Sequence, residues 1–154
     1  MLDLTLAQAL HTLAAVIWVG GMVFAYAFVR PAAGALQGPD RQILWRGVFA
    51  RFFPVVAGCV AVLLLTGYYM LFAAHGGFAG AGLHIHLMQG LGLVMMAIFA
   101  HVYVAPWRRF RDAVDGGDRA AGAQQIARIR RLVGLNLTLG LIVIAVATSG
   151  AYWT

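Results

Sequence analysis

Five histidines are the side chains of this 154-residue sequence best suited to bind a metal or to exchange protons near neutral pH. His11 lies inside the first long apolar run. Three more lie close together in the middle of the chain: His75, His84 and His86. An ionisable group inside an apolar run of membrane-spanning length is costly, so it suggests a function. The fifth, His101, lies near the far end of the third apolar run, away from the other four.

His11 and His86 are the pair that we expect to hold one b-type haem as its two axial ligands. Histidines on two facing helices commonly bind haem iron in the core of a membrane bundle. Gly90 follows His86 by one helical turn, so a porphyrin plane has room to lie close to that helix face. Trp18, two turns beyond His11, is expected to line the same site.

The sequence leaves open which histidine of the third run, His84 or His86, points inward as the ligand. His84 and His86 differ by two positions, so at about 100° per residue they point to nearly opposite faces of a helix. Tyr68 is expected to contact the cofactor from the second run, because the outer half of the predicted bundle has no arginine to receive haem propionates. A second haem is not expected, since His101 is the one histidine in the inner half of the predicted bundle and has no partner there.

Copper is the alternative to haem, because a mixed set of imidazole and thioether ligands suits copper. The candidate ligands are His75, His84, His86 and Met88. A third reading is a structural subunit of a membrane complex that binds no cofactor of its own. The five acidic residues all lie outside the long apolar runs, so no carboxylate relay crosses the membrane.

The elements that must position these residues follow from the composition. Hydrophobic residues make up 62% of the chain and charged residues only 10%, against roughly 25% in a soluble domain. We therefore expect lipid to be the solvent for most of the surface. The net charge of +6 does not indicate nucleic-acid binding, because all eleven basic residues are arginines confined to two segments, 30–51 and 108–131.

Four runs approach or exceed the roughly 20 apolar residues that cross a bilayer. They cover residues 4–29, 52–74, 83–105 and 132–153 and predict an all-α, four-helix membrane bundle in a single domain, 1–154. Helices two and four are expected to extend into the cytoplasm through the arginine-bearing segments. Arginine collects in cytoplasmic loops, which predicts a multi-pass protein of the bacterial inner membrane with both termini periplasmic. Small residues on several helix faces are compatible with a homodimer.

The sequence resembles the membrane domains of the copper resistance protein D (CopD) family. The resemblance begins at His11-Thr-Leu-Ala-Ala-Val-Ile-Trp-Val-Gly-Gly-Met22. It continues through shorter segments that cover most of the chain: Arg30-Pro31, Phe52-Phe53-Pro54, Thr66-Gly67-Tyr68 and Leu83-His-Ile-His-Leu87. The resemblance implies copper handling at the periplasmic face.

A fainter similarity links the sequence to the HemJ-like protoporphyrinogen oxidases, which are small four-helix membrane proteins with b-type haem. The segment Leu83-His-Ile-His-Leu87 is similar to their third span, with His86 in place of a lysine. In the first span, His11, Trp18 and the Gly20-Gly21 pair follow their pattern. This resemblance implies that His11 and His86 contact haem.

These observations favour a membrane b-type haem protein that acts in electron transfer or another redox reaction near the periplasmic face. Quinol, copper, a reactive oxygen species and a porphyrinogen are the candidate redox partners, beside the lipid bilayer itself. Whether the chain is an enzyme stays open, and an oxidoreductase is the class that would fit. The alternatives are a copper-handling or copper transport protein without haem and a non-catalytic subunit of a membrane complex.

Overall fold

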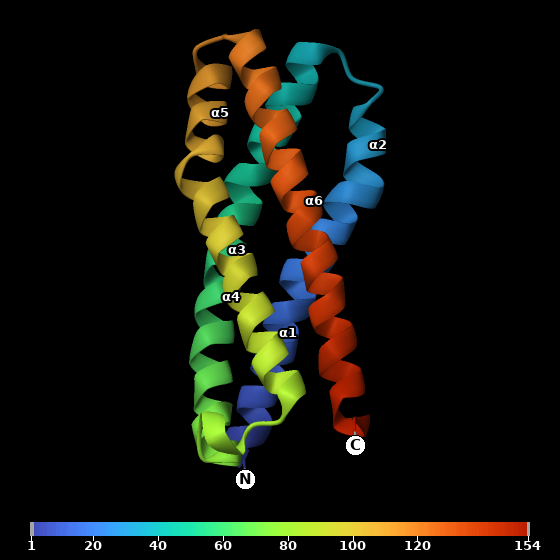
Figure 1. The fold of residues 1–154 in the computed structure, drawn as a ribbon. Helices are drawn as coiled ribbons and strands as arrows, with labels where there is room; N and C mark the ends of the chain where they lie inside the picture. Colours follow the sequence, from blue (N-terminus) through green and yellow to red (C-terminus); the bar gives the residue numbers. More distant parts are fainter. Residues whose placement is uncertain (1, 154) are drawn as a thin grey trace.

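The computed structural model describes residues 2–153, and every regular element in that range is helical, which confirms the all-α class (Figure 1). Six α-helices and three short helical turns follow one another in these described residues. Their bounds are α1 Leu2–Phe24, a π-helical turn Ala25–Val29, α2 Arg30–Ala33, α3 Gly38–His75, a 3-10 turn Phe78–Gly80, α4 Leu83–Val104, α5 Pro106–Asp115, α6 Arg119–Ser149 and a 3-10 turn Gly150–Tyr152.

Within residues 2–153, four helical units are long and apolar enough to cross a membrane, as the sequence predicts. They cover Asp3–Ala33, Gly38–His75, Leu83–Asp115 and Arg119–Ser149. Large apolar side chains cover their outer surface, and Leu65 on α3 is 73% exposed. Such a surface suits lipid and not water. The chain is therefore a multi-pass membrane protein.

The two ends of the bundle differ in charge. The ends of the described chain and the 76–82 connection lie together at the bottom of Figure 1, and we call this the arginine-free end. The segments 30–51 and 108–131 lie at the top, which we call the arginine-rich end. Here α3 and α6 extend beyond the predicted spans, as expected. The third span also extends, because α4 continues as α5 after a break at Ala105 (φ −113°, ψ −73°) before Pro106.

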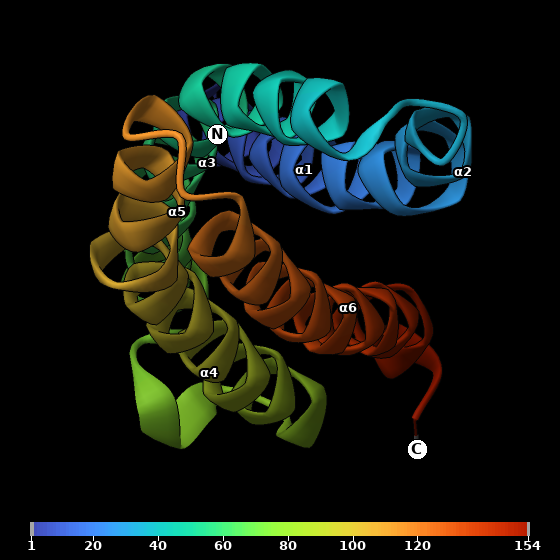
Figure 2. The same cartoon turned by 90° about the horizontal axis from the view of Figure 1, so that it is seen from above.

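The helices pack mainly as two pairs, α1 with α3 and α4 with α6 (Figures 1 and 2). Contacts of α6 with α1 and α3 join the pairs, and α5 packs on α6 at the arginine-rich end. The first span therefore has the second span, and not the third, as its main neighbour. This pairing decides what His11 on α1 meets.

One proline, Pro31, lies in the arginine-rich half of the first span. A proline inside a helix has no N–H to donate, and its ring clashes with the carbonyl four residues earlier. Pro31 lies two residues after the π-helical turn, where the Arg30 N–H bonds to the Ala25 carbonyl, five residues back. The wider turn thus accommodates Pro31 without ending the helix.

Two buried clusters hold the bundle together. The cluster at the arginine-rich end is aromatic: Phe49 stacks between Trp45 and Phe53, with ring centroids 5.1 and 5.0 Å away. Trp107 on α5 meets Phe53 edge-on at 5.5 Å, which ties α5 to α3. The cluster nearer the arginine-free end contains Trp18, Val19, Met22, Val56, Cys59 and Met95. Cys59 is a free, buried thiol there.

Candidate metal site at the arginine-free end

His11 makes one side-chain hydrogen bond, to the second span. Its Nδ1 atom lies 2.9 Å from Thr66 Oγ1 on α3. The Thr66 hydroxyl donates its own proton to the Val62 carbonyl at 2.6 Å, so Oγ1 is left to accept from the imidazole. The His11 tautomer that satisfies both bonds carries its proton on Nδ1 and keeps the Nε2 lone pair. A metal-binding histidine is typically held this way, with its second ring nitrogen donating to a protein group.

A glycine makes room for the His11 ring. A Cβ atom added to Gly67 would approach His11 Cε1 to 3.2 Å and Nδ1 to 3.7 Å. The half-buried ring therefore lies directly over the backbone of α3. Thr66 and Gly67 together fix the position of His11, one by a hydrogen bond and the other by the absence of a side chain.

A shallow open groove of about 850 Å³ lies between α1 and α3 beside this position. Met70 and His75 of α3 line it, with Gln8 and Thr12 of α1 opposite. Gln8 donates through Nε2 to Thr12 Oγ1 at 3.2 Å. The groove thus presents one thioether and one imidazole at the arginine-free end, one turn from Thr66 along α3.

His84 packs between the third and fourth spans. Its ring meets Trp153 edge-on at 6.3 Å. A Cβ atom at Gly150, where α6 ends, would clash with the His84 side chain. His84 is therefore enclosed by the end of the fourth span and lies on the other helix pair from His11.

His86 lies at the surface. Its exposed ring stacks on Phe78 of the 76–82 connection, with centroids 6.5 Å apart and planes inclined by 19°. Phe78 in turn meets Phe72 at the end of α3, edge-on at 6.2 Å. No hydrogen bond or ring contact in residues 2–153 joins His86 to His11. The haem prediction, which requires these two histidines to share one iron, stays a prediction.

The other residues expected at the haem site have separate surroundings. Trp18 is only 3% exposed and meets Phe99 of α4 edge-on at 6.1 Å. Tyr68 accepts a hydrogen bond of 3.1 Å from Gln89 Nε2, which links α3 to α4. Nothing lies within 4 Å of a Cβ atom built on Gly90, so that face of α4 is open.

The structure brings some candidate ligands together and separates others. His75 shares one groove with Met70, whereas His11 does not line that groove and bonds to Thr66, one turn from Met70 along α3. Within the described residues, no three side chains of histidine, cysteine, aspartate or glutamate form a ready-made metal cage. Met88 is half-buried on α4 and His101 is exposed, neither beside the groove. The arrangement at the α1–α3 interface suits an ion bound by few ligands of mixed nitrogen and sulfur type.

Thr66 is the contact that the sequence analysis missed, because Thr66 appears there only as part of a segment that resembles a family. A signal exists in the helical spacing, since Thr66, Gly67 and Met70 fall on one face of α3. That face meets α1 at both His11 and the groove.

Comparisons with known proteins give one match. The family model described as copper resistance protein D matches residues 46–149, about two thirds of the chain. The matched part contains His75, His84 and His86, whereas α1 with His11 precedes it. No curated protein and no solved structure matches the chain.

Proposed function

The chain belongs to the copper resistance protein D family, and from this premise we propose that it handles copper in a membrane. The ion is Cu(I), taken up at the arginine-free end by His11 together with Met70 and His75 of the adjacent groove. The observation that carries the proposal is the hydrogen bond from His11 Nδ1 to Thr66, which leaves Nε2 as a metal donor.

The chemistry of the ligands favours copper over the other metals that proteins bind. Imidazole suits several transition metals, but a thioether is a soft ligand that selects Cu(I). Met70 supplies the thioether, and His75 lies in the same groove. Carboxylates would favour harder ions, and none of the described residues that line this groove carries one.

The charge distribution supports an orientation for this uptake. Arginine-bearing segments stay on the cytoplasmic side of a bacterial inner membrane. With segments 30–51 and 108–131 inside, the groove at the arginine-free end opens to the periplasm. Copper would therefore enter from the periplasmic face, where the first and second spans meet.

The haem reading makes a different prediction for the same protein. A six-coordinate b-type haem gives purified protein a sharp reduced-minus-oxidised visible spectrum that depends on both His11 and His86. Copper handling through His11, Met70 and His75 gives a colourless Cu(I) protein, in which His86→Ala has no effect. The visible spectrum of protein expressed with ample haem therefore separates the two.

The direct test is competition for Cu(I) between the purified protein and a chromophoric Cu(I) chelator. We expect the protein to withdraw copper from the chelator, with affinity reduced at least about tenfold by His11→Ala and by the pair Met70→Leu and His75→Gln. His101→Ala is the matched control, because His101 is exposed on the third span outside the groove. Thermal unfolding of each variant checks folding. Failure of the protein to compete, or equal affinities for His11→Ala and His101→Ala, would contradict the proposal.

A further inference from the structure

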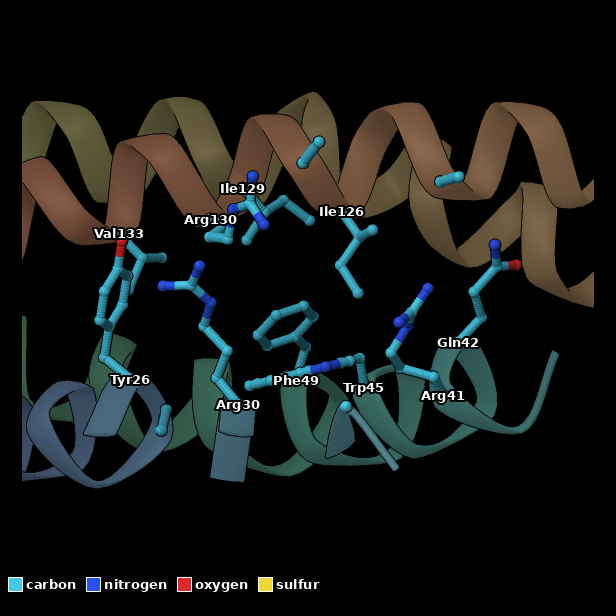
Figure 3. Close-up of a pocket in the computed structure, with 14 residues that line it drawn as sticks. Tyr26, Arg30, Arg41, Gln42, Trp45, Phe49, Ile126, Ile129, Arg130 and Val133 are labelled. Atoms are coloured by element: carbon cyan, nitrogen blue, oxygen red, sulfur yellow. The ribbon is translucent and has the colours of Figure 1, made fainter. Parts of the chain in front are cut away.

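A second cavity lies at the opposite end of the molecule, between the arginine-rich parts of the first, second and fourth spans (Figure 3). Its volume is about 390 Å³. The walls come from the π-helical turn and α2, from α3 and from α6. The lining is largely apolar, with Trp45 and Phe49 on α3 facing Ile126, Ile129 and Val133 on α6.

Three arginines also line the cavity, beside its apolar residues. Arg30, Arg41 and Arg130 come from three different helices, and Figure 3 shows the guanidinium groups of Arg30 and Arg130 turned toward each other across the cavity. Arginine stays charged under all physiological conditions, so this arrangement brings like charges together. An anion bound between Arg30 and Arg130 would offset the repulsion between them.

No carboxylate in the described part of the chain supplies that anion. The ion pairs between residues 2 and 153 are Arg46 with Asp115 at 2.9 Å and Arg111 with Asp112 at 3.2 Å, and neither involves a cavity arginine. Arg30 has an aromatic partner only, with its guanidinium carbon 4.9 Å from the Tyr26 ring centroid. The three charges are thus free to bind a ligand from outside the chain.

We propose that this cavity binds an anionic phospholipid of the surrounding bilayer. The headgroup phosphate lies between Arg30 and Arg130, and an acyl chain lies along the partly exposed Ile126 and Val133 toward Arg41. Guanidinium groups bind phosphate through paired, charge-assisted hydrogen bonds. A free phosphate ion would use only the arginines, whereas a phospholipid also covers the apolar lining. Arg30 and Arg130 lie at the ends of the first and fourth apolar runs, where lipid headgroups are found, and Arg41 lies eleven residues before the second run.

The π-helical turn positions one wall of this site. It carries Tyr26 and ends directly before Arg30, which Pro31 follows. A Cβ atom at Gly134 of α6 would come within 3.1 Å of the Tyr26 hydroxyl oxygen, so the glycine lets Tyr26 reach α6. The first span therefore forms one wall of the cavity, next to Arg30.

The experiment compares two triple variants of the full-length protein in detergent. One changes the cavity: Arg30→Gln, Arg41→Gln and Arg130→Gln. The matched control removes the same charge from exposed arginines outside the cavity that form no ion pair: Arg108→Gln, Arg109→Gln and Arg128→Gln. Delipidated protein is titrated with phosphatidylglycerol, phosphatidylcholine or inorganic phosphate, and the bound lipid is counted by native mass spectrometry alongside thermal unfolding.

We expect phosphatidylglycerol to bind and stabilise the unmodified protein and the control, with affinity at least about tenfold lower for the cavity variant. If the triple variant does not fold, the single changes Arg30→Gln and Arg130→Gln are compared with Arg108→Gln in the same way. Equal phosphatidylglycerol binding by cavity and control variants would overturn the proposal. It would also be overturned by equal stabilisation from phosphatidylcholine, or from inorganic phosphate alone.

Discussion

The ring of His11 lies against the backbone of Gly67, close enough that a Cβ atom at position 67 would be 3.2 Å from Cε1. The same ring donates to Thr66, the neighbouring residue on α3. The hydrogen bond to Thr66 and the space left by Gly67 therefore set the position of the His11 imidazole. Because the proposed copper site depends on that position, changes at residues 66 and 67 test it without removing a ligand.

Gly67→Ala is expected to weaken Cu(I) binding while leaving every proposed ligand in place. The added methyl group must push the His11 ring outward by a few tenths of an ångström, which strains the hydrogen bond to Thr66. Overpacking of this kind costs roughly 1 kcal/mol, or about a fivefold loss of affinity. Chelator competition measures it. Gly58→Ala on the same helix is the control, since no atom lies within 4 Å of its added Cβ. Equal affinities for the two variants would remove Gly67 from the site.

Thr66→Val is expected to lower Cu(I) affinity more than Thr66→Ser. Valine has nearly the shape of threonine but cannot accept the His11 Nδ1 proton, so the ring loses its tautomer preference and its anchor. Loss of such a supporting hydrogen bond typically costs about 10- to 100-fold in metal affinity. Serine keeps the oxygen and should keep most of the affinity. If valine and serine variants bind copper equally, the hydrogen bond does not prepare His11 for a metal.

The orientation of the bundle is tested by labelling single cysteines in a Cys59→Ala background. Ala79 is exposed in the 76–82 connection, and Ala120 is exposed at the arginine-rich end of α6. We expect a membrane-impermeant maleimide to label Ala79→Cys in intact spheroplasts. Ala120→Cys should react only after lysis, because arginine-bearing segments remain cytoplasmic. The opposite pattern would place the groove with Met70 and His75 on the cytoplasmic side and refute periplasmic copper uptake.

The number of spans could be predicted because each needs only a long apolar run, a property of composition alone. The helix α5 could not be found that way, because arginines dominate its stretch of sequence. A local signal was nevertheless present. Trp107, Phe110 and Val114 recur at spacings of three and four residues and face the bundle, while Arg108 and Arg109 face outward.

The partners of the histidines could not be predicted, because they depend on which helices pack together. A haem shared by His11 and His86 assumes that the first and third spans face each other across the site. In the structure α1 packs chiefly on α3, so His11 meets Thr66. The choice between His84 and His86 depends on where α4 begins. With its start at Leu83, His84 meets the end of α6 and His86 lies on Phe78.

Gly140→Ala is expected to destabilise the bundle, whereas Gly90→Ala should leave it unchanged or slightly stabilised. Alanine favours a helix over glycine by about 1 kcal/mol, so both changes gain this term. At position 140 the new Cβ would lie 2.9 Å from Val19 Cγ2 and 3.1 Å from Met95 Cε. Valine is stiff about χ1, so α1 and α6 must separate, at a cost of roughly 1–3 kcal/mol. Thermal unfolding in detergent measures both variants. A Gly140→Ala protein as stable as Gly90→Ala would show that α1, α4 and α6 do not meet closely at this glycine.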